Sequence, residues 1–243
     1  MGESNATIKY TIRKLPEFKD VSESTIKAII NVNCAAFKGD LYTKIILGGH
    51  LDLAPCMERA FLIDSLKSGH VYVAELEDGT IVGNALWHRR GDPPVGTPLT
   101  KKLLLGENAN EEGFHKFFSA LEQRDSGLAK WWNGYFQEKF SSFTQECLAT
   151  YGNKEAVWQL YSVGILPEYQ RYGIGTAFVK AIEDQITNNP NSDPADRKIS
   201  LVADMDVARK FYHKLGFVIR GETIIEGYGD LGTCPLWHFV KDV

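Results

Sequence analysis

Residues 157–186 read VWQLYSVGILPEYQRYGIGTAFVKAIEDQI and contain three successive patterns. Residues 157–166 form an apolar run rich in β-branched and aromatic side chains, which predicts a mostly buried strand. Pro167 ends this run, and an amphipathic helix follows. Its buried face is marked by apolar residues at helical spacing, namely Ile174, Ala177, Phe178, Ala181, Ile182 and Ile186. The segment therefore predicts a strand, a tight loop and a helix in immediate succession.

Two glycines, Gly173 and Gly175, stand where this helix begins. Glycine in a helix costs about 1 kcal/mol relative to alanine, so two in the first turn indicate a special demand on the backbone. The first N–H groups of a helix have no partner within it, and the helix dipole makes that end positive. Such amides, when no side chain covers them, form a cradle for phosphate. An ordinary strand-to-helix turn, with glycines that serve packing, is the alternative.

Residues 170–175 have the form Q/R-x-x-G-x-G/A, and the longer run ILPEYQRYGIGTAFV resembles the acetyl-CoA pyrophosphate loop of the GNAT superfamily of N-acetyltransferases. The resemblance implies acetyl-CoA as co-substrate. It implies that the preceding strand splays from the next one, at residues 199–203, and pairs with the pantetheine arm. An N–H group of that strand would polarise the thioester carbonyl. The implied cofactor-binding residues are Val163, Gly164, Ile165, Gln170, Arg171, Tyr172, Gly173, Ile174, Gly175 and Thr176.

Residues 206–217, DVARKFYHKLGF, carry a second resemblance to the same family, whose members often end a helix with A-x-x-x-Y-x-K-x-G-F. The resemblance implies that Tyr212 lies near the CoA sulfur as general acid. A phenol with a pKa of about 10 can protonate a thiolate whose conjugate acid has a pKa of about 8.5. A core tyrosine is the alternative. The chain departs from the family at Met205, where an asparagine commonly contacts the cofactor.

A general base is required because an alkyl amine, with a pKa near 10, is mostly protonated at pH 7. The candidates are Glu155, just before the strand expected at 157–166, Asp204, at the end of the next strand, and His88, at the end of the hairpin. Each of them is also a plausible surface or capping residue, and a chain of water molecules is an alternative base. No motif positions a nucleophilic cysteine, so the resemblance implies direct attack by the amine.

Composition excludes several other classes of protein. The chain has 243 residues, a net charge of −4 and no block of five Lys or Arg, which argues against nucleic-acid binding. Four widely spaced cysteines fit reduced thiols in a cytoplasmic protein. No signal peptide and no run of about 18 apolar residues occurs, so no membrane association is expected. Without H-E-x-x-H or C-x-x-C, we expect no metal site.

Residues 227–232 spell G-x-G-x-x-G, the fingerprint of dinucleotide-binding loops. The fingerprint acts only where a strand precedes it and a helix follows it. Here it lies between two expected strands, at 217–225 and 235–240, which form a closing hairpin. We therefore expect no dinucleotide site.

The remaining patterns predict one GNAT-like domain over residues 1–243. A strand is expected at 7–15, a helix capped by Ser22 or Ser24 with Ile26, Ile29, Ile30 and Asn33 or Cys34 on one face, and a helix at 53–67. A hairpin follows, with strands at 70–75 and 80–88. Asp204 or Asp206 is expected to cap a helix at 207–215. The fold class is α/β, with a mixed, mostly antiparallel twisted sheet and helices on both faces.

Residues 90–154 break this element order and are expected to be an inserted helical and loop segment. Its aromatic side chains are expected to pack against the domain, and the segment is a candidate wall of the acceptor pocket. The implied function is acetyl transfer from acetyl-CoA to a primary amine of a small molecule. The alternatives are acetylation of a protein N-terminus or lysine, and a non-catalytic acyl-CoA-binding domain. The sequence leaves the acyl-chain length and the oligomeric state open.

Overall fold

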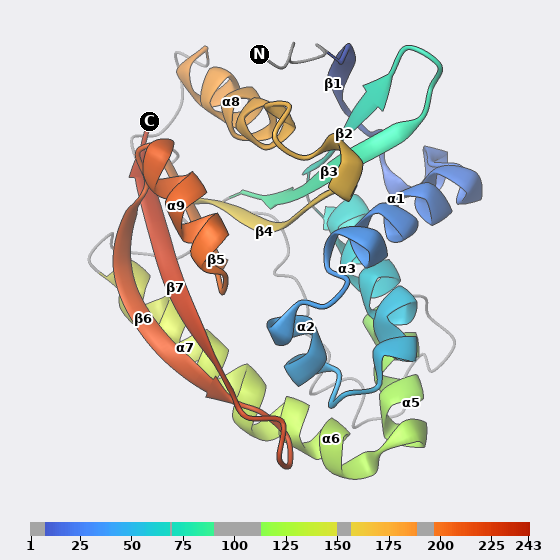
Figure 1. The fold of residues 1–243 in the computed structure, drawn as a ribbon, viewed down its shortest axis with the longest axis vertical. Helices are drawn as coiled ribbons and strands as arrows, with labels where there is room; N and C mark the ends of the chain where they lie inside the picture. The colour runs from blue at the N-terminus through green and yellow to red at the C-terminus, as the bar shows by residue number, and fades with distance from the viewer. Residues whose placement is uncertain (1–7, 69, 90–112, 150–156, 189–196) are drawn as a thin grey trace, which may run out of the picture.

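The computed structural model describes residues 8–68, 70–89, 113–149, 157–188 and 197–243, and these contain a seven-stranded sheet. The strand order is β1-β2-β3-β4-β5-β7-β6. Neighbouring strands are antiparallel, with the exception of β4 and β5, which are parallel. Figure 1 shows helices on both faces of this sheet. The expected fold class is confirmed.

The first half of the chain follows the expected order, with one element more. It comprises β1 (Tyr10–Lys14), α1 (Glu23–Ala36), α2 (Leu41–Ile46), α3 (Ala54–Ser68), β2 (His70–Leu76) and β3 (Ile81–His88). The side chain of Ser22, not that of Ser24, caps α1 by accepting a hydrogen bond from the N–H of Thr25 at 3.2 Å. The short helix α2, which Asp40 caps, was not predicted from the sequence.

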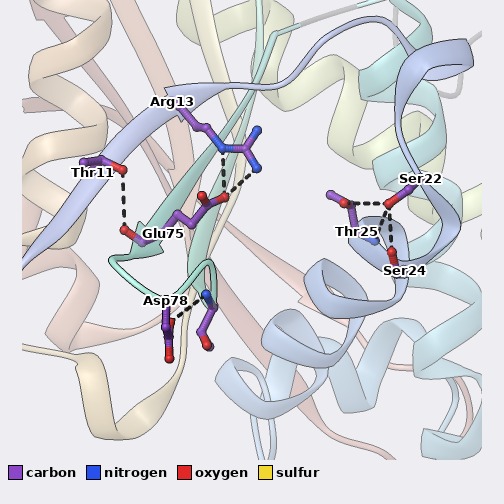
Figure 2. Close-up of polar contacts among 8 residues, drawn as sticks. Thr11, Arg13, Ser22, Ser24, Thr25, Glu75 and Asp78 are labelled. Atoms are coloured by element: carbon purple, nitrogen blue, oxygen red, sulfur yellow. Dashed lines mark hydrogen bonds and ion pairs between the residues drawn. The ribbon is translucent and has the colours of Figure 1, made fainter.

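Local polar contacts fix the ends and the register of these elements, as Figure 2 shows. Arg13 Nε on β1 donates to a carboxylate oxygen of Glu75 on β2 at 2.8 Å. Asp78 Oδ1 accepts the N–H of Thr80 at 2.9 Å in the turn between β2 and β3. Each of these exposed contacts contributes at most about 1 kcal/mol, so packing of the apolar faces holds the fold together.

Two pairs of helices cover the two faces of the sheet. Helices α1 and α3 pack on β2 and β3 through buried aliphatic side chains such as Ile29 and Leu62. On the opposite face, α8 (Ile174–Thr187) and α9 (Asp206–Lys214) pack through Phe178, Ile182 and Tyr212. The apolar face expected for residues 174–186 is therefore the face that α8 buries.

The chain between the neighbouring strands β3 and β4 contains additional helices. They are α5 (Phe114–Arg124), α6 (Ser126–Trp131), a π-helical turn (Trp132–Phe136) and α7 (Gln137–Leu148), which Figure 1 shows in green between α3 and β6. Their aromatic side chains share one core with α2, α3 and the end of the β6–β7 hairpin. Phe117, Phe118 and Trp132 are buried there, so these rings serve packing, as expected.

The last two strands, β6 (Val218–Glu226) and β7 (Thr233–Asp242), form the expected hairpin. The G-x-G-x-x-G motif is the connection between them, so no helix follows it. Gly216 adopts a left-handed φ of +87° after α9, as a residue that ends a helix does. The expected cap of α9 is wrong, because Met205 occupies the N-cap position and no side chain caps the helix. Asp204 faces Asp40 instead.

Two smaller observations complete the fold. All four cysteines lie in the described part of the chain and are free thiols. Within the described residues, no helix combines the length and the apolar character needed to cross a lipid bilayer.

Candidate active site

The sheet opens between its two parallel strands. β4 (Trp158–Ile165) pairs with β5 (Lys198–Ala203) at three positions, from Trp158 opposite Ile199 to Leu160 opposite Leu201. On its other side β4 remains paired with β3 as far as Ile165. Residues 161–165 therefore present an unpaired edge toward β5, and the splay expected from the sequence is confirmed.

The backbone groups on this open edge can be assigned from the hydrogen bonds on the other side. The N–H of Leu166 donates to the carbonyl of Val82 on β3 at 2.9 Å. Backbone groups alternate sides along a strand, so Gly164 also faces β3, whereas Val163 and Ile165 face the opening. Gln170 Nε2 donates to the carbonyl of Ile165 at 3.1 Å and so ties the following loop to this edge.

Gly164 is a glycine because of a helix that packs against it. A Cβ at this position would lie 2.2 Å from Oδ1 of Asn33 on α1. That distance is far shorter than any real contact, so a side chain at residue 164 would force the Asn33 side chain out of its place. Gly164 therefore leaves room for the side chain of Asn33.

The loop between β4 and α8 has an unusual backbone. Arg171 has a φ of +70° and Gly173 a φ of +85°, both left-handed. Within the described residues, the N–H groups of residues 171–176 have no hydrogen-bond acceptor, because the first helical bond of α8 runs from Ala177 to Gly173. A run of N–H groups at a helix N-terminus with left-handed residues before it forms an anion-binding concavity. The geometry fits a pyrophosphate.

The side chains of this loop divide into two groups. Gln170, Arg171, Tyr172 and Thr176 are exposed, whereas Ile174 is buried beneath α8 and offers its backbone alone. A Cβ on Gly175 would lie 3.1 Å from the ring of Phe211 on α9. Gly175 is therefore needed for packing of α8 against α9, and Gly173 for its left-handed φ.

Tyr212 lies in the core beneath the opening. Its ring is 5% exposed and meets the rings of Phe211, Phe217 and Phe239 at centroid distances of 5.0, 5.5 and 5.8 Å. Burial raises the pKa of Tyr212, which makes the phenol a weaker acid than usual. Its hydroxyl has no hydrogen-bond partner among the described residues. The general-acid role stays a prediction.

Two carboxyl groups meet on the β5 side of the opening. Asp40 caps α2, with Oδ2 accepting the N–H of Thr43 at 2.7 Å. Its other oxygen, Oδ1, is buried and has no donor within the described part of the chain. Asp204 follows β5 directly, and burial together with the neighbouring Asp40 carboxyl raises the pKa of Asp204 well above its usual range. A proton shared by the two carboxyls would give Asp40 its missing donor.

The acid pair, Asp40 and Asp204, is half-buried and has Tyr42 and Cys234 as neighbours. Burial, with Asp204 and Asp40 nearby, raises the pKa of the Tyr42 hydroxyl. Cys234 is 1% exposed, and burial with the same two carboxyls raises the pKa of its thiol to about 12. A thiol that keeps its proton and is out of reach is no nucleophile.

The other base candidates lie elsewhere. His88 is buried, lies 3.1 Å from Ser65 Oγ through Nε2, and pairs with Gln159 in the part of β4 that still bonds β5. Burial lowers the pKa of His88 to about 4. Glu155 falls outside the described residues. Asp40 was not predicted as a site residue. It stands directly before Leu41, and Ile45 and Ile46 follow at helical spacing, which is the pattern of an N-cap before an apolar helix face.

Comparisons with known proteins agree with this geometry. Residues 142–219, which span the open strand, the loop and α9, match the family model of the acetyltransferase (GNAT) domain. A comparison with curated proteins gave no match.

Two solved structures share the fold. A mosquito arylalkylamine N-acetyltransferase like 5b is 15% identical, with a TM-score of 0.55, over 97% of this chain and 100% of that one. Arylalkylamine N-acetyltransferase 2 from Aedes aegypti is 15% identical, with a TM-score of 0.53, over 95% of this chain and 98% of that one. At this identity the likeness concerns the fold.

Proposed function

We propose that this chain is an acyltransferase that moves an acetyl group from acetyl-CoA to a primary amine of a small molecule. The proposal is supported by the match of residues 142–219 to the family model of the acetyltransferase (GNAT) domain. One observation carries the proposal. The open edge of β4 leads into the loop of unpaired N–H groups, and Asp204 stands across the opening at the end of β5. A strand edge for the thioester arm, a cradle for phosphates and a base for the amine thus border one opening.

Acetyl-CoA would be held mainly by backbone groups. Its pyrophosphate would accept hydrogen bonds from the N–H groups of residues 171–176, with the positive end of α8 behind them. Its pantetheine arm would pair with Val163 and Ile165 along the open edge. An N–H of this edge would stabilise the negative charge that develops on the thioester oxygen.

The acid pair supplies the base for the chemical step. In its fully ionised form it takes a proton from the incoming ammonium group, which leaves a neutral amine. The amine nitrogen then forms a bond to the acetyl carbonyl carbon, and the bond from that carbon to sulfur breaks. Sulfur leaves as a thiolate, to which the Tyr212 hydroxyl is proposed to donate a hydrogen bond or its proton.

Direct attack follows from the thiol beside the acid pair. Cys234 is buried, and burial together with these two carboxyls raises the pKa of its thiol to about 12. An acyl-enzyme on Cys234 would require an exposed thiolate. This argues against an acyl-enzyme on Cys234 and supports the proposal that the amine attacks the thioester itself.

A small acceptor is favoured by the way in which the inserted helices enclose this side of the molecule. Tyr135 accepts the N–H of Glu226 through its hydroxyl at 2.9 Å, and Tyr228 donates to Asp125 at 3.2 Å. These contacts join the inserted helices to the β6–β7 hairpin, which carries Cys234 beside the acid pair. A protein substrate would need an open groove here.

An assay of thiol release from acetyl-CoA tests the proposal. The acceptor panel contains an arylalkylamine, a polyamine, an aminoglycoside, and peptides with a free N-terminus or an internal lysine. We expect saturable thiol release with at least one small amine and acetylated product by mass spectrometry. Activity with peptides alone would replace the small acceptor by a protein. If no amine supports release although acetyl-CoA binds, the chain is a non-catalytic acyl-CoA-binding domain.

A further inference from the structure

A chain of buried polar side chains runs behind the open edge of β4. Asn33 on α1, Glu58 on α3 and Asn84 on β3 are 0%, 4% and 0% exposed. Asn33 Nδ2 donates to Glu58 Oε2 at 2.9 Å, and Asn84 Nδ2 donates to Asn33 Oδ1 at 2.6 Å. These bonds connect two helices with the sheet, and the carboxylate and both amides lie where the neighbouring core is apolar.

This polar chain, Glu58–Asn33–Asn84, contacts the open strand at one point. Asn84 is directly opposite Gly164 in the β3–β4 register, so both residues face the same side of the sheet. Asn33 lies over the pair, and its Oδ1 occupies the space that a Cβ of residue 164 would need, at 2.2 Å. Gly164 stands between Val163 and Ile165, whose backbone groups face the opening.

Stability alone does not explain why these residues are polar. Burial raises the pKa of Glu58 to about 7, opposed by the hydrogen bond from Asn33 and assisted by the charge of Asp40. Asn84 Oδ1 is buried and lacks a donor among the described residues, which lowers the stability of the fold. Well-packed apolar side chains in such a place are often at least as stable. The hydrogen bonds of the polar chain fix the orientation of its three side chains, which apolar contacts would leave free.

We propose that Asn33, oriented by Glu58 and Asn84, is a positioning residue that sets the place of the open half of β4 and so aligns its N–H groups with the thioester. This inference rests on the proposed function. Beyond Leu160, β4 has lost β5 and is held in the sheet by β3 alone. The contact of Asn33 with Gly164 supplies a second restraint on this half-free strand.

The contact predicts a specific coupling between two substitutions. Gly164→Ala places a methyl group against Asn33 Oδ1, and we expect kcat to fall at least tenfold. In Asn33→Ala the obstacle is absent, so adding Gly164→Ala should change kcat by no more than about twofold. Asn33→Ala alone should lower kcat at least fivefold with a smaller change in KM for acetyl-CoA, because the phosphate loop is untouched. Asn33→Ser replaces Asn33→Ala if the latter does not fold.

Glu58 provides the control that separates positioning from mere stability. Glu58→Gln still offers an oxygen to Asn33 Nδ2 and should keep kcat within about threefold. Glu58→Leu removes the acceptor and should lower kcat as Asn33→Ala does. All rates are taken per folded enzyme well below the melting temperature, which is measured for each variant.

The possible failures are distinguishable. If the wild-type protein releases no thiol with any amine, the proposed function fails. If it is active, and Gly164→Ala lowers kcat equally with and without Asn33, or Asn33→Ala lowers the melting temperature but leaves kcat unchanged, the positioning role is overturned.

Discussion

The two sides of the β4–β5 opening present different chemical groups, backbone N–H groups on one side and side-chain carboxyls on the other. On the β4 side, the strand edge and the loop before α8 present backbone N–H groups of residues that are consecutive in the chain. On the opposite side, Asp40 and Asp204 bring two side-chain carboxyls together from the N-cap of α2 and the end of β5. Because the first side would bind through backbone N–H groups, its positions tolerate substitutions that neither cover these groups nor bring a negative charge close to them. The second depends on two particular residues and on their proton.

The largest expected effect comes from the acid pair. Asp204→Asn and Asp40→Asn keep the shape of the side chain but remove the base, and each should lower kcat/KM about 100-fold, the usual contribution of a general base. Asparagine caps helices as well as aspartate does, so Asp40→Asn should preserve α2. Steady-state kinetics with the best amine of the panel measures the loss, and thermal melting checks the fold. Retention of half the activity by both variants would exclude the pair as base.

The pH dependence of these variants sharpens the assignment. The pair acts as a base once its shared proton is lost, and its raised pKa places that loss well above the ordinary carboxyl range near 4. The wild-type enzyme combines the ionised pair with an ammonium group, so its kcat/KM should increase with pH and level off above the raised pKa of the pair. Asp204→Asn has no base and can use only the free amine, so its kcat/KM should continue to increase toward the amine pKa near 10. A wild-type profile that does not level off before that of Asp204→Asn would contradict a titrating base.

Tyr212 should show a smaller effect. Tyr212→Phe keeps the ring contacts with Phe211, Phe217 and Phe239 and removes the hydroxyl alone. Because a thiolate is a tolerable leaving group and the raised pKa weakens this acid, we expect kcat to fall about three- to tenfold with little change in cofactor affinity. Full activity in stopped assays of thiol release would leave Tyr212 as a core residue.

The same contrast explains what could be predicted from the sequence. The strand, loop and helix over residues 157–186 form one contiguous pattern, so the opening and the buried face of α8 could be predicted from it. The left-handed φ of Gly173 was not predicted. Asp40 and Asp204 meet through tertiary structure, and no local pattern pairs them. Asn33 stood on the expected buried face of α1, but spacing could not tell that it would meet Glu58, Asn84 and Gly164.

Gly175 shows that a residue of a binding motif can also be required for packing. The motif assigns it to the phosphate cradle, whereas a Cβ there would press on Phe211. Substitution of Gly175 would therefore disturb the packing of α9 as well as any bound phosphate. A clean test of the loop needs a residue whose side chain is exposed.

The most direct test of the central claim, that the loop before α8 binds the acetyl-CoA pyrophosphate through backbone N–H groups, is calorimetric titration of acetyl-CoA. The proteins are wild type, Thr176→Glu and the matched control Thr176→Gln, with NADH as control ligand. Thr176 is exposed in the first turn of α8, where a glutamate favours the helix but repels a phosphate. The account predicts one saturable site in wild type, similar affinity in Thr176→Gln, at least tenfold weaker binding in Thr176→Glu with an undiminished melting temperature, and no binding of NADH. Absence of acetyl-CoA binding to the folded wild-type protein, or equal affinity in all three proteins, would contradict it.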